Sequence, residues 1–393
     1  MIESEKMTYA GVGVDYDAMD PFKRDAQIAG RETAENIHRL NGGEFQEVEM
    51  SRGESAYLIE ALKSYFAHVE EGLGTKNLVA DAMYKLTGKS YYDHIAQCTV
   101  AMIVNDLITL LALPLSVAMH LAVASSEWFN DAKRCRDLIE GWKKACNLAR
   151  CVWGGGETPT LKGVVVPGTV LLSGSAMGII KPKERMASAD KIQHGDAIVI
   201  LESSGIHANG LTLARIIAER KDSIWRKIAN FFMPNRFPLR ALPEGYLTKL
   251  SDGRTYGETL LDPTHIYVGI IDDCLNQGID IHYAVNITGH GWRKFMRANR
   301  LFTYIIDTLP KQLPIFPFMQ KYGPIDDREA YGNLNMGAGF ALYIAEADVP
   351  AVLEISKANG IGALRAGHIE TGEKKVVIKP KNIVYLGSTL RVR

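Results

Sequence analysis

A short segment with two acidic residues and two glycines, residues 70–76 (EEGLGTK), has the residue types of a phosphate site. Glycines let backbone N–H groups approach a phosphate, a lysine adds a point charge, and a carboxylate can hold Mg²⁺. The spacing is not that of a Walker A loop, and a plain turn with a solvated lysine is the commoner meaning of so short a segment. The segment is therefore a candidate phosphate site that needs support from elsewhere in the chain.

Two further carboxylates lie in unusual surroundings. Asp106 follows Asn105 inside an otherwise apolar run, and burying an ionised carboxylate is costly unless it is paired or bound to a metal. Glu157 follows three glycines in residues 154–160 (GGGETPT), where a ligand or another backbone can come close. The alternatives are a helix-end cap at Asp106 and a solvated Glu157 beside a strand turn.

Residues 203–210 (SSGIHANG) connect an apolar, strand-like run to a helix-like run that begins at residue 211. In a strand, turn and helix of this kind, the N–H groups of the helix and nearby hydroxyls can hold an anion. Ser203, Ser204, His207 and Asn209 are candidate contacts. The alternative is that Ser204 and Asn209 only cap the helix.

Two more glycine turns, residues 286–291 (NITGHG) and 335–340 (NMGAGF), lie beside apolar segments. Taken alone, they predict ordinary turns at strand ends. The chain contains no Ser-His-Asp order, no H-E-x-x-H pair and no G-x-S-x-G elbow. The sequence therefore gives no support for a nucleophilic hydrolase.

The composition is that of a globular protein, with 47% hydrophobic and 23% charged residues. Lys+Arg and Asp+Glu are 45 each, so the basic excess typical of a nucleic-acid binder is missing and we expect no nucleic-acid partner. The five cysteines form no metal spacing and favour a reducing compartment. The first residues lack the apolar core of a signal peptide. We expect a cytoplasmic protein without a membrane partner.

Helix-like and strand-like segments alternate along the chain, which predicts an α/β or α+β fold. We expect helices over residues 54–66, 93–113 and 130–150, strands over 114–122 and 164–180, and a glycine turn after a short strand near residue 152. Residues 107–126 have no charge and the length of a membrane span, but Pro114 divides them, so we interpret them as a buried helix followed by a buried strand.

A polar segment after residue 180 predicts a domain boundary near residue 182. It divides the chain into residues 1–182 and 183–393. Residues 221–260 contain Trp225, Phe231, Phe232 and two prolines, and no role follows from their pattern. We interpret this segment as an insertion.

In their order and rough spacing, eight segments resemble the aminoimidazole ribonucleotide synthetase family. They are AGVGVDYDA near the start, EGLGTK, AMIVND, GGGET, HGDAIVILESSGIHANGLTLAR, DPTHIY, NITGHG and EAYGNLNMGAGF, and together they span about residues 9–385. The resemblance implies a two-domain α/β (α+β) fold. The N-terminal domain, residues 1–182, would bind ATP and dimerise through a β-barrel-like core, and the C-terminal α/β domain, residues 183–393, would complete the substrate cleft.

The resemblance also implies a reaction, the ATP-dependent ring closure of formylglycinamidine ribonucleotide to aminoimidazole ribonucleotide in purine biosynthesis, through a phosphorylated amide. The implied cofactors are ATP and Mg²⁺, and the implied partners are a small-molecule nucleotide substrate and a second copy of the chain in a homodimer. Two alternatives stay open. The chain is a superfamily paralogue that acts on another substrate, or it is a catalytically silent nucleotide-binding or partner subunit.

Carried over position by position, the resemblance gives roles to individual residues. Catalysis is assigned to Asp106, Glu157 and Lys76, and metal binding to Glu71, Asp106 and Glu157. The cofactor site would comprise Glu71, Gly72, Gly74, Thr75, Lys76, Asn105, Gly155 and Gly156. The substrate site would comprise Ser203, Ser204, Gly205, His207, Asn209, Thr288, Gly289 and Asn335. The chain departs from the family pattern at Glu71 in place of Asp, at His290 inside a glycine turn, and at residues 54–66 in place of a glycine-rich segment.

Overall fold

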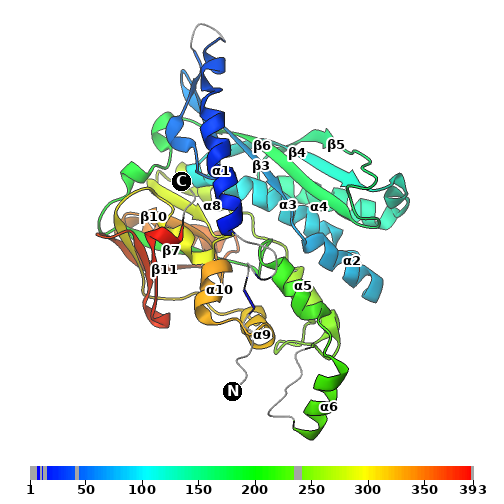
Figure 1. Cartoon of the computed structure of the whole chain (residues 1–393). Helices are drawn as coiled ribbons and strands as arrows, with labels where there is room; N and C mark the ends of the chain where they lie inside the picture. Colours follow the sequence, from blue (N-terminus) through cyan, green and yellow to red (C-terminus); the bar gives the residue numbers. More distant parts are fainter. Residues whose placement is uncertain (1–6, 9–10, 12–15, 40–43, 234–240, 391–393) are drawn as a thin grey trace.

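A computed structural model describes residues 7–8, 11, 16–39, 44–233 and 241–390. Two β-sheets, each with its own helices, make up the molecule (Figure 1). All strands of the first sheet precede residue 182 in the chain, and all strands of the second sheet follow it. The mixed α/β fold that the sequence predicts is therefore confirmed.

The first sheet has six strands in the order β1-β2-β3-β6-β4-β5. They are β1 (Gln46–Glu47), β2 (Tyr57–Ala61), β3 (Ser64–Gly72), β4 (Leu113–Val123), β5 (Val152–Glu157) and β6 (Val170–Ile180). Three helices accompany the sheet, α2 (Lys76–Thr87), α3 (Tyr92–Leu107) and α4 (Ala132–Leu148). Helix α3 packs on β3 and β6, and α4 packs on α3. Within the described part of one chain the sheet is open, so the β-barrel expected for a dimer stays a prediction.

The second sheet has seven strands in the order β13-β12-β9-β11-β7-β10-β8. They are β7 (Ala197–Glu202), β8 (Ile281–Asn286), β9 (Phe302–Ile306), β10 (Ala338–Ile344), β11 (Ala363–Thr371), β12 (Lys375–Ile378) and β13 (Ile383–Leu386). The helices of this half are α5 (Leu211–Glu219), α6 (Ile224–Phe232), α7 (Tyr256–Leu260), α8 (Val268–Asn276), α9 (Ile315–Tyr322), α10 (Asp327–Asn333) and α11 (Val349–Ala358). β7, β8 and β10 are buried along almost their whole length, because the sheet is covered on both faces.

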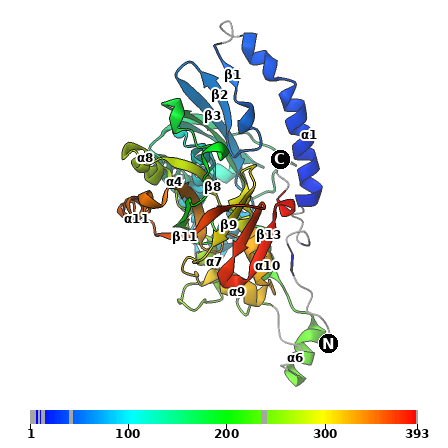
Figure 2. The same cartoon turned by 90° about the vertical axis from the view of Figure 1, so that its left-hand side faces the viewer.

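An N-terminal helix, α1 (Tyr16–Arg31), connects the two halves along one side of the molecule (Figure 2). Near its start, Asp20 lies 4.0 Å from the ring of His290 in the second half. Near its end, the carbonyl oxygen of Gly30 accepts a hydrogen bond from Arg52 in the first half. The helix therefore contacts both halves.

The prediction of a helix over residues 54–66 is wrong, because these residues form the hairpin β2–β3. Their apolar residues fit a helical period and a strand period equally well, and the aromatic and β-branched residues Tyr57, Ile59 and Tyr65 favour the strand. Leu58 and Ala67 on facing strands are buried while Leu62 at the turn is exposed. The glycine turn expected in residues 154–156 is also wrong, since all three glycines lie inside β5.

The helix expected over residues 93–113 exists but ends at Leu107. A 3₁₀ turn (Ile108–Leu110) follows it, and Leu111 takes a left-handed conformation with φ 64°, which redirects the chain into β4. The strand predicted after Pro114 and the helix predicted over residues 130–150 are confirmed as β4 and α4, and Leu138, Trp142 and Ala145 form the buried face of α4. Among the described residues, no helix has the length and apolar character needed to cross a bilayer.

Candidate functional site

A cavity of about 200 Å³ lies where the two halves of the molecule meet. Its walls come from the end of β3, the last turns of α3, the turn between β7 and α5, and the end of β8. The lining residues are Glu71, Gly72, Gly74, Met102, Asp106, Ala208, Asn209, Asn286 and Thr288. Six of these nine are residues that the sequence analysis names individually as candidates: Glu71, Gly72, Gly74, Asp106, Asn209 and Thr288. The structure therefore brings four distant motifs to one place.

Glu71 and Asp106 form an acidic pair on one wall of the cavity. Asp106 is buried at the C-terminal end of α3, and its Oδ1 accepts a 2.6 Å hydrogen bond from the Asn286 amide at the end of β8. Burial, followed by the charge of Asp106, raises the pKa of Glu71 to about 8, while the positive charge of Lys294 acts in the opposite direction. With this raised pKa, Glu71 holds a proton near neutral pH. A metal ion that binds here would displace this proton, which passes to a base or to water.

Lys294 supplies the positive charge beside this pair. It lies in a 3₁₀ segment (Gly291–Met296), is buried, and donates a hydrogen bond from Nζ to Oγ1 of Thr288, which lines the cavity. Burial lowers the pKa of Lys294 to about 8, although the charges of Asp106 and Glu71 favour its protonated form. Sequence reasoning missed this residue. The available signal was a lysine placed between Trp292, Phe295 and Met296, where a solvated side chain is unusual.

His290, the departure inside the glycine turn, takes a left-handed conformation with φ 69° and is buried. Burial, with the positive charges of Arg293 and Lys294, lowers its pKa to about 3. The ring is therefore neutral at physiological pH. It faces Asp20 of α1 and does not line the cavity.

The turn between β7 and α5 is held by its own hydrogen bonds. Asn335 accepts a 3.1 Å bond from Ser203 and donates a 2.9 Å bond to the carbonyl oxygen of Gly205. Ser204 donates to the carbonyl oxygen of Pro263 at 2.6 Å, and its N–H donates to the ring of His207. Neither Ser204 nor Asn209 caps α5 through a side-chain hydrogen bond, since the N-cap residue is Gly210. These bonds fix the turn so that Ala208 and Asn209 face the cavity.

For most residues of the predicted substrate site, direct contact with a substrate stays a prediction. Asn209 and Thr288 line the cavity, whereas Ser203, Ser204, Gly205, His207, Gly289 and Asn335 do not. Burial, together with the charges of His265 and Lys76, lowers the pKa of His207 well below its ordinary value. Its ring is neutral and accepts the hydrogen bond from Ser204. His207 therefore supports the turn.

Lys76, Thr75 and Asn105 connect the two halves of the molecule. Lys76 is fully buried, and its ammonium group donates to the carbonyl oxygens of His207 at 2.8 Å and Asp262 at 2.7 Å. Thr75 lies 3.3 Å from the hydroxyl of Thr212, and Asn105 bonds to the backbone of His265 and Tyr267. The catalytic and phosphate-binding role predicted for Lys76 stays a prediction, and in this structure its charge is satisfied by two carbonyl groups.

Glu157 is not brought to the acidic pair within one chain. β5 and β3 are separated by β4 and β6, which is roughly 14 Å at the usual spacing of strands. Gly156 leaves space for the neighbouring strand, since a Cβ there would lie 2.0 Å from the carbonyl oxygen of Met119. In the described residues no three His, Cys, Asp or Glu side chains gather as a metal site. Glu71, Asp106 and Glu157 therefore do not come together within the described part of a single chain, and their assignment to metal binding stays a prediction.

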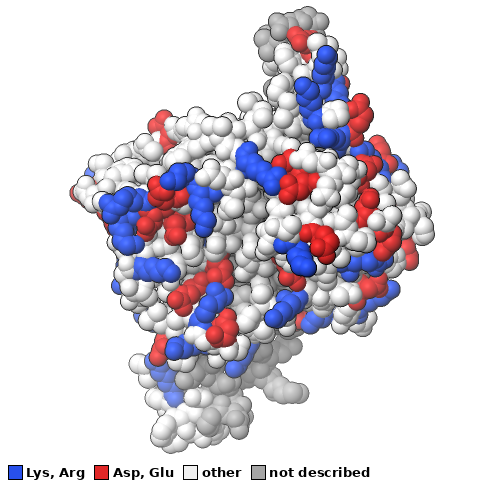
Figure 3. Space-filling view, turned by 180° about the vertical axis from the view of Figure 1, so that it is seen from behind, with Lys and Arg blue, Asp and Glu red and all other residues white. Residues whose placement is uncertain are grey.

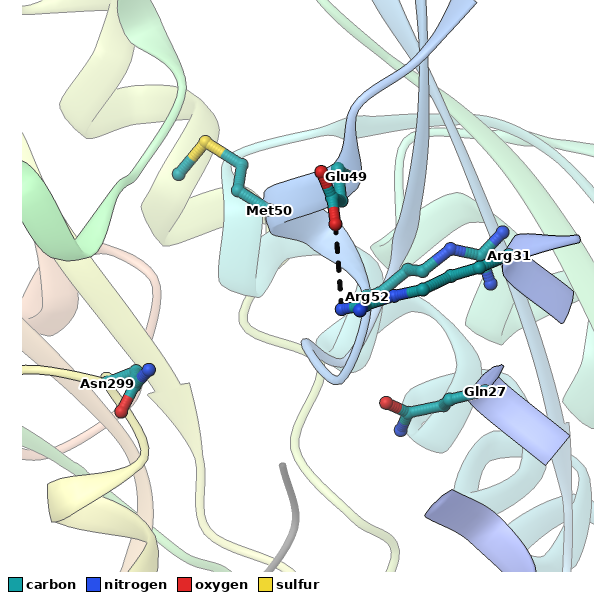
Figure 4. A pocket seen from close by; sticks show the side chains of 6 residues that line it. All are labelled: Gln27, Arg31, Glu49, Met50, Arg52 and Asn299. Atoms are coloured by element: carbon teal, nitrogen blue, oxygen red, sulfur yellow. Dashed lines mark ion pairs between the residues drawn. The ribbon is translucent and has the colours of Figure 1, made fainter. Parts of the chain in front are cut away.

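A second hollow of about 400 Å³ lies under α1 (Figure 4). It is lined by Gln27, Arg31, Glu49, Met50, Arg52 and Asn299. Its two arginines are paired, Arg31 with Glu49 at 3.7 Å and Arg52 with Glu47. Their charges are therefore already balanced, and the smaller cavity beside Glu71 is the better candidate for an active site.

Both halves of the chain match domains of a known protein family. The family of AIR synthase related proteins matches with its N-terminal domain over residues 58–180 and with its C-terminal domain over residues 193–379. Phosphoribosylformylglycinamidine cyclo-ligase from Methanococcus maripaludis is 33% identical over 93% of this chain and 92% of that protein. The protein of the same name from Carboxydothermus hydrogenoformans is 30% identical over 95% of this chain and 99% of its own length.

Solved structures share the fold at low sequence identity. A chain of the HypE–HypF complex covers 90% of this chain and 97% of its own length, with a TM-score of 0.57 and 14% identity. PurL from T. maritima, in complex with FGAR, covers 84% of this chain and 46% of its own length, with a TM-score of 0.53 and 13% identity. These likenesses show the architecture. Together with the sequence matches, they show that the chain belongs to the AIR synthase related family, among the phosphoribosylformylglycinamidine cyclo-ligases.

Proposed function

We propose that the chain catalyses the ATP-dependent ring closure of formylglycinamidine ribonucleotide, giving aminoimidazole ribonucleotide, ADP and phosphate. The main support for this proposal is the sequence similarity to cyclo-ligases, which extends over almost the whole length of this chain and of those proteins. The acidic pair in the cavity between the two matched domains is consistent with this chemistry. In the proposed reaction the formyl-derived amide oxygen attacks the γ-phosphorus, and ADP leaves. The amidine nitrogen then attacks the activated carbon, loses a proton, and phosphate departs.

The acidic pair fits a magnesium ion that arrives with ATP. Mg²⁺ is commonly held by one or two carboxylates together with substrate phosphates, and Glu71 and Asp106 are two carboxyl groups on one wall. Because the raised pKa of Glu71 keeps a proton on its carboxyl group near neutral pH, one further negative charge becomes available when that proton leaves. We propose these two residues as the protein ligands. When bound, the ion would neutralise the triphosphate.

The remaining groups of the cavity position the substrate. Asn209 and Thr288 face the cavity from opposite elements of the C-terminal half and can bond to ribose or phosphate oxygens. Lys294 holds Thr288 and places a positive charge where a phosphate would lie. Lys76 donates hydrogen bonds from the N-terminal half to the carbonyl oxygens of His207 and Asp262, and these bonds fix the position of one cavity wall relative to the other. Positioning of this kind supplies most of the rate in phosphoryl transfer, since no protein nucleophile is required.

We further propose a homodimer whose interface is formed mainly by residues 54–180. Helices α3 and α4 are stacked on one face of the first sheet. Leu115, Leu171, Met177 and Val152 are exposed apolar residues on its strands, and an apolar patch of this kind marks an interface. In a dimer, Glu157 on β5 could approach the acidic pair of the partner subunit. Sedimentation velocity should give a dimer at micromolar concentration, and a monomer would refute this part of the proposal.

Product analysis tests the proposed reaction. The purified chain is incubated with ATP, MgCl₂ and formylglycinamidine ribonucleotide, and aminoimidazole ribonucleotide is quantified by chromatography. We expect one product molecule for each ADP. Thiamine monophosphate in place of the substrate is the control for a superfamily paralogue. Turnover with the control alone would support the paralogue, and binding of ATP without any turnover would support a catalytically silent subunit.

A further inference from the structure

Two of the five cysteines meet at the connection between α4 and β5. Cys146 lies in the last turn of α4 and is buried, while Cys151, one residue before β5, is partly exposed. All five cysteines are free thiols in the structure. Neither Cys146 nor Cys151 lines the cavity beside Glu71, so the proposed ring closure does not explain why the two thiols are paired.

The way in which α4 ends brings the two side chains together. Arg150 is left-handed, with φ 53°, and its N–H donates to the carbonyl oxygen of Asn147, while the N–H of Cys151 donates to that of Cys146 at 3.1 Å. These are the two bonds of a Schellman motif, which brings the first and last side chains of the turn into contact. With standard bond geometry, the 3.1 Å bond keeps the two Cα atoms at most roughly 6.8 Å apart. A disulfide spans such a separation.

Arg150 holds this turn against the second half of the molecule. Its guanidinium group pairs with Asp272 and, at 2.7 Å, with Asp273, and both carboxylates belong to α8. Asp273 also accepts a 2.9 Å hydrogen bond from Asn359. A left-handed conformation is uncommon for a residue other than glycine, and these ion pairs offset its cost. The turn is therefore fixed with its two cysteines already side by side.

The two thiols of the pair differ in reactivity. The thiol of Cys146 donates a hydrogen bond to the sulfur of Cys151, which lowers the pKa of Cys151 and raises the pKa of Cys146. Because the thiolate is the nucleophilic form of cysteine, Cys151 is the sulfur that reacts first. Cys135 on α4 provides a contrast, since it is also partly exposed but burial raises its pKa.

The proposed dimer leaves Cys151 open to small reagents. Successive residues of a strand face opposite sides of the sheet. Trp153 packs on Trp142 of α4, with the ring centroids 5.9 Å apart, so Cys151, two residues earlier, lies on the side of the sheet that the helices cover. The exposed Val152 between them faces the open side, which is the side proposed as the interface.

We propose that Cys146 and Cys151 form a redox-active dithiol, which hydrogen peroxide converts into a disulfide. The thiolate of Cys151 attacks one oxygen of the peroxide, the O–O bond breaks, and hydroxide leaves, which gives a sulfenic acid. Cys146 then loses its proton and attacks the sulfur of Cys151, the S–O bond breaks, and a second hydroxide leaves. The two thiol protons convert both hydroxides into water. Two thiols are thus oxidised while one peroxide is reduced.

Hydrogen peroxide suits this site in size and in charge. Cys151 is only partly exposed, which favours a small reagent over a bulky disulfide. On the face in Figure 3, basic and acidic side chains are interspersed, so no field of a single sign would gather a charged reagent there. A neutral oxidant needs no such field to reach the sulfur.

Peptide mapping of the full chain tests the proposal. Trypsin cleaves after Lys144, Arg150 and Lys162, so the two cysteines fall into separate peptides, 145–150 and 151–162. The chain is treated with hydrogen peroxide, its remaining thiols are alkylated, and it is digested without reductant. Mass spectrometry should then show the two peptides joined, and a thiol reductant should separate them again. In the reduced chain, iodoacetamide should modify Cys151 at least about tenfold faster than Cys135.

Three variants separate the pair from general oxidation. Cys151→Ser should give no joined peptides. Cys146→Ala, which keeps an apolar side chain in the core, should stop at the sulfenic acid of Cys151, which dimedone labels. Cys135→Ser, at the partly exposed cysteine of α4, is the matched control and should form the joined peptides as the parent does.

Two results would overturn the proposal, and both are read from the parent chain, so they do not depend on the folding of any variant. One is that peptides 145–150 and 151–162 stay separate when the same peroxide solution fully oxidises free glutathione. The other is that iodoacetamide modifies Cys135 as fast as Cys151. The peptide map needs neither ATP nor a nucleotide substrate, so a failure of the ring-closure assay would leave its result unchanged.

Discussion

The two walls of the central cavity use polar residues in different ways. On the N-terminal wall, Glu71 and Asp106 face the cavity, and burial together with mutual repulsion raises the pKa of Glu71. Behind the C-terminal wall, Ser203, Ser204 and Asn335 do not line the cavity and are satisfied by internal hydrogen bonds. Ionisable groups whose charged form is disfavoured by burial are available for chemistry, whereas polar groups that are satisfied by internal hydrogen bonds fix a shape. The first wall is therefore expected to govern rate and the second to govern stability.

Asp106→Asn should have the largest effect on rate. The substitution removes the charge from the buried end of α3 but keeps an oxygen that can accept the hydrogen bond from Asn286. We expect a loss of at least about a hundredfold in kcat with little change in the unfolding midpoint. Asp93→Asn, in the first turn of the same helix and about half exposed, is the matched control. Near-normal turnover of Asp106→Asn at saturating Mg²⁺ would make Asp106 a structural residue.

Glu71→Gln should lose most of the activity, whereas Glu71→Asp should keep or raise it, because charge toward the metal matters more than reach. A change in geometry of about 1 Å can itself lower a rate on the order of a hundredfold, so the Asp variant is compared with the parent at several Mg²⁺ concentrations. Glu70→Gln, at the exposed neighbouring position of β3, is the control. A Gln variant as active as the parent would remove Glu71 from the site.

Asn335→Ala should act on stability more than on rate. It leaves Ser203, the carbonyl oxygen of Gly205 and the N–H of Gly337 without their partner. We expect the free energy of unfolding to fall by about 1–3 kcal/mol in urea titration. Asn276→Ala, which removes one exposed hydrogen bond on α8, should cost much less. An unchanged urea midpoint with a large loss of kcat would reverse the assignment of the two walls.

The pH dependence of stability is the smallest expected effect. Glu71 has a pKa of about 8 in the folded chain and near 4.5 when exposed, so the folded state binds more protons between these values. Its contribution to stability is therefore present below pH 4.5 and is lost as the pH rises toward 8. Glu71→Gln should flatten the decline in unfolding free energy over that range by about 1–2 kcal/mol. Glu70→Gln should keep the slope of the parent, and identical slopes for all three would contradict the assignment.

The sequence predicts the parts of the site that depend on local pattern. Asp106 stands out because its surroundings are uncharged, and the turn of residues 203–210 is recognisable from the strand and helix beside it. The hairpin of β2 and β3 was not predictable in the same way, because the spacing of its apolar residues fits the period of a helix and that of a strand equally well. Lys76 could not be placed either, since its two acceptors lie 131 and 186 residues away in the chain.

The residues that the sequence did not identify owe their positions to packing between the halves. Lys294 and Met102 reach the cavity region only because the 3₁₀ segment after β8 and the middle of α3 meet there. Glu157 fits a family motif, yet strand order keeps it away from Glu71 in one chain. The family motif predicts that Glu157 takes part in the reaction. The strand order of the sheet shows that Glu157 lies far from Glu71 of its own chain.

Substrate-dependent release of ADP tests the central claim most directly. ADP is measured with ATP and Mg²⁺ present, with and without formylglycinamidine ribonucleotide, for the parent and for Asp106→Asn. The account predicts that the substrate raises ADP release by the parent at least about a hundredfold and leaves the variant near its background. ADP release that is the same with and without the substrate, or the same in parent and variant, would contradict it.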